Sequence, residues 1–244
     1  ISYPLVILMK DIFLIAKHLF CKFLVFACAS DSSSCNSIQE NPLLETKDTA
    51  VITSTTTSNF KRALFGITIF NNNMWIAGGT PPQSYFYSTK EINTWQTYQL
   101  TDHIAKRDAN CLIKFNNKLW IMGGYSFIYP RGKKRILGDT WVSEDGIEWN
   151  LVDTPGLKWS ERHHHRCIVF DNKLWVIGGF HTNKFFLNDV WNSRDGVTWT
   201  KVLNKAPWEA RSNFGLVELN NKLWIYGGEN STTKAITDIW SSSD

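Results

Sequence analysis

The sequence predicts an all-β protein built from four copies of one small antiparallel sheet. The first observation is a repeated segment, in which "FDNKLWVIGGF" at 170–180 returns as "FNNNMWIAGGT" at 70–80, "FNNKLWIMGGY" at 115–125 and "LNNKLWIYGGE" at 219–229. The second is the period, because the central tryptophans at 75, 120, 175 and 224 are separated by 45, 55 and 49 residues. The third is that all twelve tryptophans occupy repeated positions in this alignment. A fixed period of this length is typical of repeat architectures.

The chain begins with an apolar segment, residues 1–30, which we interpret as an export signal or an anchor. Lysines interrupt the apolar run at Lys10, Lys17 and Lys22, and small residues follow near its end, a composition typical of export signals. The same charges make the segment a poor membrane span. The sequence therefore predicts an exported protein.

Two details of this region bear on processing. Met9 is a plausible translation start, and "VFAC" at 25–28 resembles a bacterial lipobox, in which Cys28 would carry the lipid. Residues 31–58 are polar and rich in Ser and Thr, so we expect a tether between the apolar segment and a folded domain at 59–244.

Each repeat is expected to form four short strands joined in a meander. The repeats span about 60–104, 105–159, 160–208 and 209–244, and the last one stops before its fourth strand. In the second repeat, "CLIKF" and "KLWIM" are joined by Asn116–Asn117, and Asn-Asn suits a two-residue hairpin because Asn tolerates positive φ. "DTWVS" and "EWNLV" form the outer pair around the turn at 144–146, and the glycine pair is expected to end the second strand.

Both faces of these strands are apolar, so each sheet must be covered on both sides. Leu119 and Ile121 alternate with Trp120 and Met122, which point to the opposite face. Similar sheets stacked around an axis satisfy this requirement, which predicts a β-propeller. At about 25 cal/mol per Å², each buried indole contributes several kcal/mol, so tryptophan packing between sheets should supply most of the cohesion.

The repeats resemble the kelch repeat. An arginine stands before each first strand, a glycine pair follows each second strand, and the second and third repeats carry Ser-x-Asp-Gly-x-x-Trp at 143–149 and 193–199. The resemblance covers about residues 60–244, and the Ser-x-Asp-Gly-x-x-Trp variant is similar to kelch-like propellers of bacterial exported proteins and of the galactose-oxidase central domain. Such propellers usually have six or seven blades, whereas four are visible in this sequence.

The resemblance implies that ligands bind where the loops after the glycine pairs meet the channel. The implied residues are Arg62, Arg107, Arg162, Arg211, Tyr125, Phe180, His181 and Glu229. A ring of guanidinium groups could bind a carboxylate or sulfate. Alternatively, each arginine pairs with an aspartate or with carbonyl groups of its own blade, and its presence in every repeat favours this structural role.

The loop that follows the second glycine pair is longer than its counterparts. Its surplus residues add aromatic and basic side chains: Tyr125, Phe127, Tyr129, Arg131, Lys133, Lys134 and Arg135. Insertions into a repeat often lie on a binding face, and this mixture suits an acidic glycan or an acidic protein surface. A solvated loop without a ligand is the alternative.

The sequence predicts neither a metal site nor a cofactor. Alternation would place His163 and His165 of the triple histidine on one face, but no aligned His or carboxylate completes a site. Cys35, Cys111 and Cys167 remain after the apolar segment, and this odd, scattered set predicts no disulfide framework.

These patterns favour a non-catalytic binding propeller of the cell envelope or exterior that recognises a protein or an acidic glycan. A carbohydrate-active enzyme is the alternative, either similar to sialic-acid mutarotases, with Arg162, Arg211 and Glu229 near the channel, or, less well supported, similar to galactose oxidase. An intracellular adaptor is a third alternative. The net charge of +4 and the absence of a dense Lys/Arg run argue against nucleic acid, and membrane contact is expected only through the N-terminal segment.

Overall fold

The computed structural model divides the chain into two units, Ile1–Thr55 and Thr56–Asp244. It describes residues 62–81, 85–91, 94–100, 104, 106–126, 135–181, 185–231 and 235–242, all in the second unit. The predicted signal, the lipidation site at Cys28 and the tether lie outside these residues. Within the described ranges, no helix has the length and apolar character needed to span a membrane.

The second unit contains four antiparallel sheets that follow one another along the chain. The strands are β1 (Gly66–Phe70), β2 (Asn73–Ala77), β3 (Tyr85–Thr89) and β4 (Gln96–Gln99) in the first sheet; β5 (Arg107–Asp108), β6 (Cys111–Phe115), β7 (Lys118–Ser126), β8 (Arg135–Ser143) and β9 (Asn150–Leu151) in the second; β10 (Arg166–Phe170), β11 (Lys173–His181), β12 (Phe185–Ser193) and β13 (Thr200–Leu203) in the third; and β14 (Gly215–Leu219), β15 (Lys222–Tyr226) and β16 (Ile239–Ser241) in the fourth.

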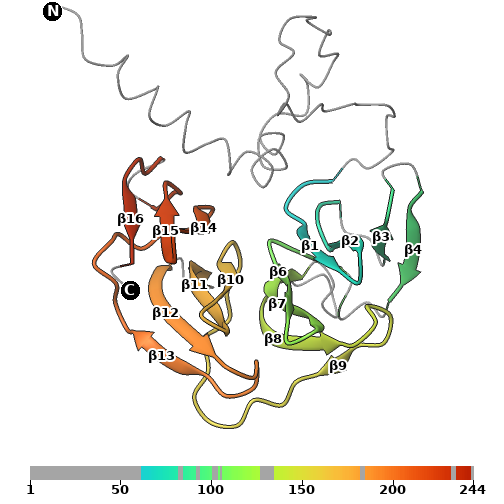
Figure 1. The fold of residues 1–244 in the computed structure, drawn as a ribbon. Helices are drawn as coiled ribbons and strands as arrows, with labels where there is room; N and C mark the ends of the chain where they lie inside the picture. Colours follow the sequence, from blue (N-terminus) through green and yellow to red (C-terminus); the bar gives the residue numbers. More distant parts are fainter. Residues whose placement is uncertain are drawn as a thin grey trace, which may run out of the picture. The chain divides into compact units, whose positions relative to one another are not determined.

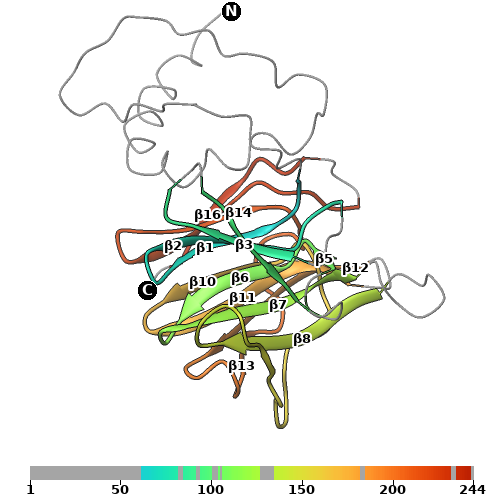
Figure 2. The ribbon, with the colours of Figure 1, turned by 90° about the vertical axis from the view of Figure 1, so that its right-hand side faces the viewer.

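The sheets are arranged as the blades of a propeller, which confirms the predicted fold (Figure 1). Strands β1, β6, β10 and β14 lie innermost, and β6 packs beside β1 on one side and β10 on the other. Figure 2, turned by 90°, shows the blades from the side. We refer to the four sheets as blades 1 to 4.

The asparagine turns form as predicted. Asn116 and Asn117 have φ of 48° and 56°, and they join Phe115 to Lys118 in a two-residue hairpin. The other three blades repeat this geometry at 71–72, 171–172 and 220–221. Residue types that tolerate positive φ therefore fix the register of every inner hairpin.

The glycine pairs do not end the second strand in every blade. Strands β7 and β11 continue through their glycines, with a bulge beside Gly123 and Gly178, whereas β2 and β15 end just before theirs. Gly124 has φ of 103°, and a Cβ on it would lie 2.6 Å from the Asp108 carbonyl oxygen. The prediction was correct that a side chain would obstruct a neighbouring backbone, but a bulge replaces the expected strand end in blades 2 and 3.

The core lies between successive blades, where the tryptophans pack. The Trp75 indole of blade 1 covers Gly146 in the β8–β9 turn of blade 2. The contact is so close that a Cβ added to Gly146 would lie 2.3 Å from the Cη2 atom of Trp75. Trp120 covers Gly196 of blade 3 in the same way. Both indoles are buried, so tryptophans do pack between sheets as predicted, with an indole on a glycine turn as the repeated contact.

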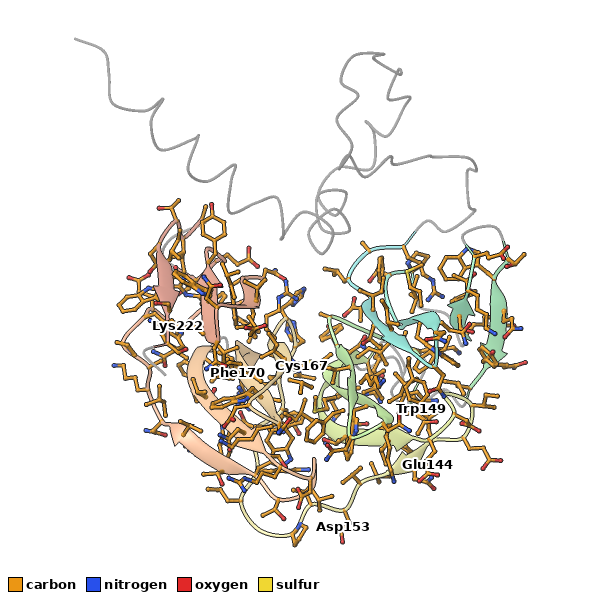
Figure 3. All side chains as sticks on the ribbon, viewed as in Figure 1. Glu144, Trp149, Asp153, Cys167, Phe170 and Lys222 are labelled. Carbon is orange, nitrogen blue, oxygen red and sulfur yellow. A yellow bond between two sulfur atoms is a disulfide. The ribbon has the colours of Figure 1, made fainter. Side chains whose placement is uncertain are left out.

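A disulfide joins blades 2 and 3, which corrects the prediction drawn from the scattered cysteines. Cys111 on β6 and Cys167 on β10 are bonded, with Cα atoms 6.1 Å apart (Figure 3). The cysteines are separated by 56 residues in the sequence, but they lie on neighbouring inner strands. Cysteine number and spacing contain no information about this proximity.

Candidate functional site

Three of the four repeated arginines are buried inside their own blades. Arg162 has no exposed side-chain surface, and its Nη1 and Nη2 atoms donate to the two Asp189 oxygens at 2.7 and 2.8 Å. Asp189 also accepts from Trp191 Nε1 at 2.7 Å, and Arg162 Nη1 donates to the Gly178 carbonyl at 3.0 Å. Burial alone would raise the pKa of Asp189, but the hydrogen bond and charge of Arg162 outweigh it and lower that pKa.

The same arrangement holds Arg107 on Asp139 and Arg211 on Asp238, again with no exposed arginine side-chain surface. Blade 1 differs because Tyr85 occupies the aspartate position. There, Arg62 donates to the Gly78 carbonyl at 2.6 Å and lies 4.7 Å from the centre of the Tyr87 ring. Arg107, Arg162 and Arg211 therefore pair with aspartates of their own blades, which is the arrangement given above as the alternative to ligand binding.

A chain of backbone hydrogen bonds links the innermost parts of the blades. The amide of Ala109 donates to the Leu64 carbonyl at 2.7 Å, His164 to Ala109 at 3.0 Å, and Asn213 to His164 at 3.2 Å. All four residues have φ between 48° and 58°. Each stands two residues after a repeated arginine, and we call the surface around them the axial mouth.

The predicted residues after the glycine pairs lie beside this mouth. Tyr125 pairs with Asp108, Phe180 with His163, and Glu229 with Ser212, each next to one residue of the linked chain. The structure therefore brings Tyr125, Phe180 and Glu229 to one region, as predicted. The first and second residues after each arginine were not predicted to lie on this surface, although they differ in all four repeats.

Aromatic rings connect blades 2 and 3 at the mouth. The His163 ring lies 5.6 Å from Tyr125 and 5.3 Å from Phe180, measured between centroids, and Phe180 lies 4.9 Å from Phe186. Burial, followed by the neighbouring His164, lowers the pKa of His163 to about 4. The pKa of His164 is also lowered to about 4, first by burial and then by Arg166. Both imidazoles are therefore neutral at pH 7.

The polar groups of the mouth are acidic or neutral. Asn213 Nδ2 donates to Glu229 Oε1 at 2.6 Å, and Thr80 Oγ1 donates to Asp108 Oδ2 at 2.6 Å. Glu229 is exposed, whereas Asp108 is buried. Neutral imidazoles, an amide and a carboxylate thus surround the aromatic rings.

The triple histidine does not present one face. His164 has φ of 53°, which interrupts strand alternation, and the Nδ1 atoms of His163 and His164 contact each other. His165 is buried 6.0 Å from the Trp159 ring, and neither of its ring nitrogens has a hydrogen-bond partner among the described residues. Among the residues that the structure describes, no group of three or more His, Cys, Asp or Glu side chains could hold a metal ion.

The long loop of blade 2 is only partly described. Phe127, Tyr129, Arg131, Lys133 and Lys134 lie outside the described residues. Arg135 begins β8, is exposed and forms an ion pair with Glu161 at 3.3 Å. It lines a groove of about 980 Å³ between blades 2 and 3, together with His181, Trp141 and Lys158.

Comparisons with known proteins agree with this architecture. The sequence profile of the KLHDC2/KLHL20/DRC7 Kelch-repeats domain matches residues 21–228. The solved structure of YjhT is similar, with a TM-score of 0.59 and 15% identity, a likeness that concerns the fold alone. The match covers 69% of this chain and 57% of that chain, so this chain spans less than two thirds of that structure. A search of curated proteins found no match.

Proposed function

The chain is a member of the kelch-repeat family, and from this premise we propose that it is a non-catalytic binding module of the cell envelope or exterior. Its ligand is an acidic glycan or an acidic protein surface, bound by the basic loop of blade 2 on the face where that loop leaves Ser126 and returns at Arg135. A kelch propeller serves many activities, so this proposal depends on the side chains of that face and not on the fold.

One observation carries the proposal: three of the repeated arginines are engaged within their own blades, whereas the residues after the glycine pairs differ among the repeats and lie beside the mouth. The three buried arginines are held by aspartates, whereas Tyr125, Phe180 and Glu229 retain accessible surface beside the channel. A mutarotase-like site would use Arg162, Arg211 and Glu229. Because both arginines lack exposed side-chain surface, we propose binding in preference to catalysis.

The acidic ligand is proposed from the basic residues of the loop. Arg131, Lys133 and Lys134 are followed by Arg135, whose exposed guanidinium pairs with the Glu161 carboxylate at 3.3 Å. Exposed pairs of this kind are weak, about 0–1 kcal/mol, so a polyanion could displace Glu161 at little cost. Aromatic neighbours add stacking surface to this positive charge.

The proposed location outside the cytoplasm is supported by the Cys111–Cys167 disulfide. Disulfides persist in oxidising compartments and are rare in the cytosol. Both cysteines lie on inner strands, so the bond would form during folding and not on an exposed surface. Recovery of these thiols in free, alkylatable form from rapidly quenched cells would contradict this location.

The ligand proposal is tested by replacing Arg131, Lys133, Lys134 and Arg135 with Ser and measuring binding to hyaluronan, polysialic acid, heparin and poly-glutamate. We expect binding of at least one of these by the parent protein, weakening with salt, and a loss of at least tenfold in the variant. The control variant replaces four basic residues at the opposite strand ends, of which Lys90, Lys114 and Arg194 are exposed and Lys118 is half-buried. Equal losses in both variants, or no binding by the parent, would reject the proposal.

A further inference from the structure

A second groove lies on the other side of blade 3, between blades 3 and 4, with a volume of about 570 Å³. We propose that this groove binds a neutral oligosaccharide. Its lining includes Phe185, Phe186, Lys205, Trp208, Glu209 and Asn230. These residues and this ligand chemistry are separate from the basic loop of blade 2, so the proposal does not depend on the acidic ligand.

The walls of this groove are fixed by hydrogen bonds before any ligand arrives. Asn188 Nδ2 donates to the carbonyls of Ala206 and Trp208 at 3.0 and 2.8 Å, which ties the connection between the blades to β12. Asn230 Nδ2 donates to Glu209 Oε2 at 2.8 Å and joins blade 4 to the same connection. A preformed groove loses little conformational entropy on binding.

The equivalent groove between blades 2 and 3 lacks one of these ties. Gly138 occupies the position of Asn188, so no side-chain amide can hold the connection there. That groove is also larger, about 980 Å³ against 570 Å³. The smaller groove is therefore the better defined of the two and the better suited to one ligand shape.

Aromatic rings on β12 supply one wall. Phe185 is 64% exposed, so its ring is accessible to a ligand in the groove. The Phe186 ring lies 4.9 Å from the Phe180 ring, measured between centroids. Phe180 in turn contacts His163, so this row of rings extends to the axial mouth. The apolar C–H face of a pyranose ring packs on the electron-rich face of such rings. A chain of several sugars could follow this line from the groove toward the mouth.

The polar groups determine the class of ligand. Lys205 and Glu209 carry opposite charges, so together they contribute no net charge, and Asn230 adds an amide. Sugar hydroxyls both donate and accept, so they can satisfy the carboxylate and the ammonium group together. A proline-rich peptide also suits aromatic grooves, but proline has no N–H and cannot donate to Glu209. The carboxylate therefore favours the saccharide.

The test measures binding of cellohexaose, xylohexaose, maltohexaose, laminarihexaose and chitohexaose by calorimetry, with a proline decapeptide and hyaluronan as competing ligand classes. We expect one neutral hexasaccharide to bind, and its affinity to exceed that of the corresponding disaccharide. Phe185→Ser and Glu209→Gln should each weaken binding about three- to tenfold, the range expected from one ring contact or one charged hydrogen bond.

Tyr226→Ser is the matched control because Tyr226 is 54% exposed on β15 and does not line the groove. It should leave the affinity unchanged. Phe185 is exposed, so its replacement tests the surface and not folding, and unchanged circular dichroism would verify this. Failure of all five saccharides to bind, unchanged affinity in both groove variants, or binding of only the proline peptide or hyaluronan at this groove would overturn the proposal.

Discussion

The contact between Trp75 and Gly146 provides a direct test of how the blades cohere. Gly146 lies in the β8–β9 turn with φ of 86°, and a Cβ added to it would lie 2.3–2.7 Å from three atoms of the Trp75 ring. Gly156 provides a matched control, with φ of 80° and no atom within 4 Å of an added Cβ. Both Gly→Ala substitutions carry the same backbone cost, but only Gly146→Ala creates a clash.

The expected magnitudes follow from these two terms. A left-handed backbone conformation costs an L-residue roughly 1–2 kcal/mol, so Gly156→Ala should lower the free energy of unfolding by about that amount. Overpacking adds about 1–3 kcal/mol, so Gly146→Ala should lower it by about 2–5 kcal/mol. Urea unfolding, followed by circular dichroism, measures both values.

A double-mutant cycle identifies the clashing partner. In a Trp75→Leu background, Gly146→Ala should cost about as much as Gly156→Ala, because the indole that obstructs the Cβ is gone. Equal costs for Gly146→Ala and Gly156→Ala in the parent protein would refute the packing argument. An unchanged cost of Gly146→Ala in the Trp75→Leu background would refute the assigned partner.

Two further predictions concern stability. The pKa values of His163 and His164 are about 4 in the folded chain and 6.5 in the unfolded chain. The unfolded state therefore binds more protons between these values. The free energy of unfolding should fall as the pH drops from about 6.5 toward 4. The double variant His163→Ser, His164→Asn copies Ser212–Asn213 of blade 4. Its Tm should fall less between pH 7.5 and 4.5 than the Tm of the parent protein, and equal falls would contradict this cause. Reducing the Cys111–Cys167 disulfide removes a cross-link between cysteines that are 56 residues apart in the sequence. On the chain-entropy account, this should lower the free energy of unfolding by about 4 kcal/mol. Cys111→Ser should match the reduced protein and be insensitive to dithiothreitol, and a reduced protein as stable as the oxidised one would disprove the contribution.

Local residue chemistry made the fold predictable. The hairpins depend on residue pairs such as Asn116–Asn117, whose tolerance of positive φ is a local property. The four-strand meander and its apolar faces also follow from residues that are neighbours in the sequence. Because the same pattern occurs in four repeats, each repeat supports the interpretation of the others. The bulge beside Gly123 was missed because positive φ allows either a strand end or a bulge, and only pairing with β8 decides between them.

The site was less predictable because it depends on neighbours from different blades. Cys111 and Cys167 meet only because β6 and β10 lie side by side around the axis. The linked chain through Ala109 and His164 is made of backbone groups, which leave no residue-type signature in the sequence. A usable signal did exist, since the two residues directly after each repeated arginine differ in all four repeats, although the arginine and the glycine pair recur in each.

This pattern of identity and difference constrains what the axial mouth can recognise. The backbone places Leu64, Ala109, His164 and Asn213 at equivalent points, but their side chains are apolar, small, imidazole and amide in turn. Glu229 adds an exposed carboxylate at blade 4, where it accepts from Asn213, whereas the Asp108 carboxylate of blade 2 is buried. A ligand with rotational symmetry could not match four positions whose side chains differ. If a ligand binds at the mouth, we therefore expect it to be asymmetric, with its hydrogen-bond donors toward blade 4 and its apolar part toward blade 1.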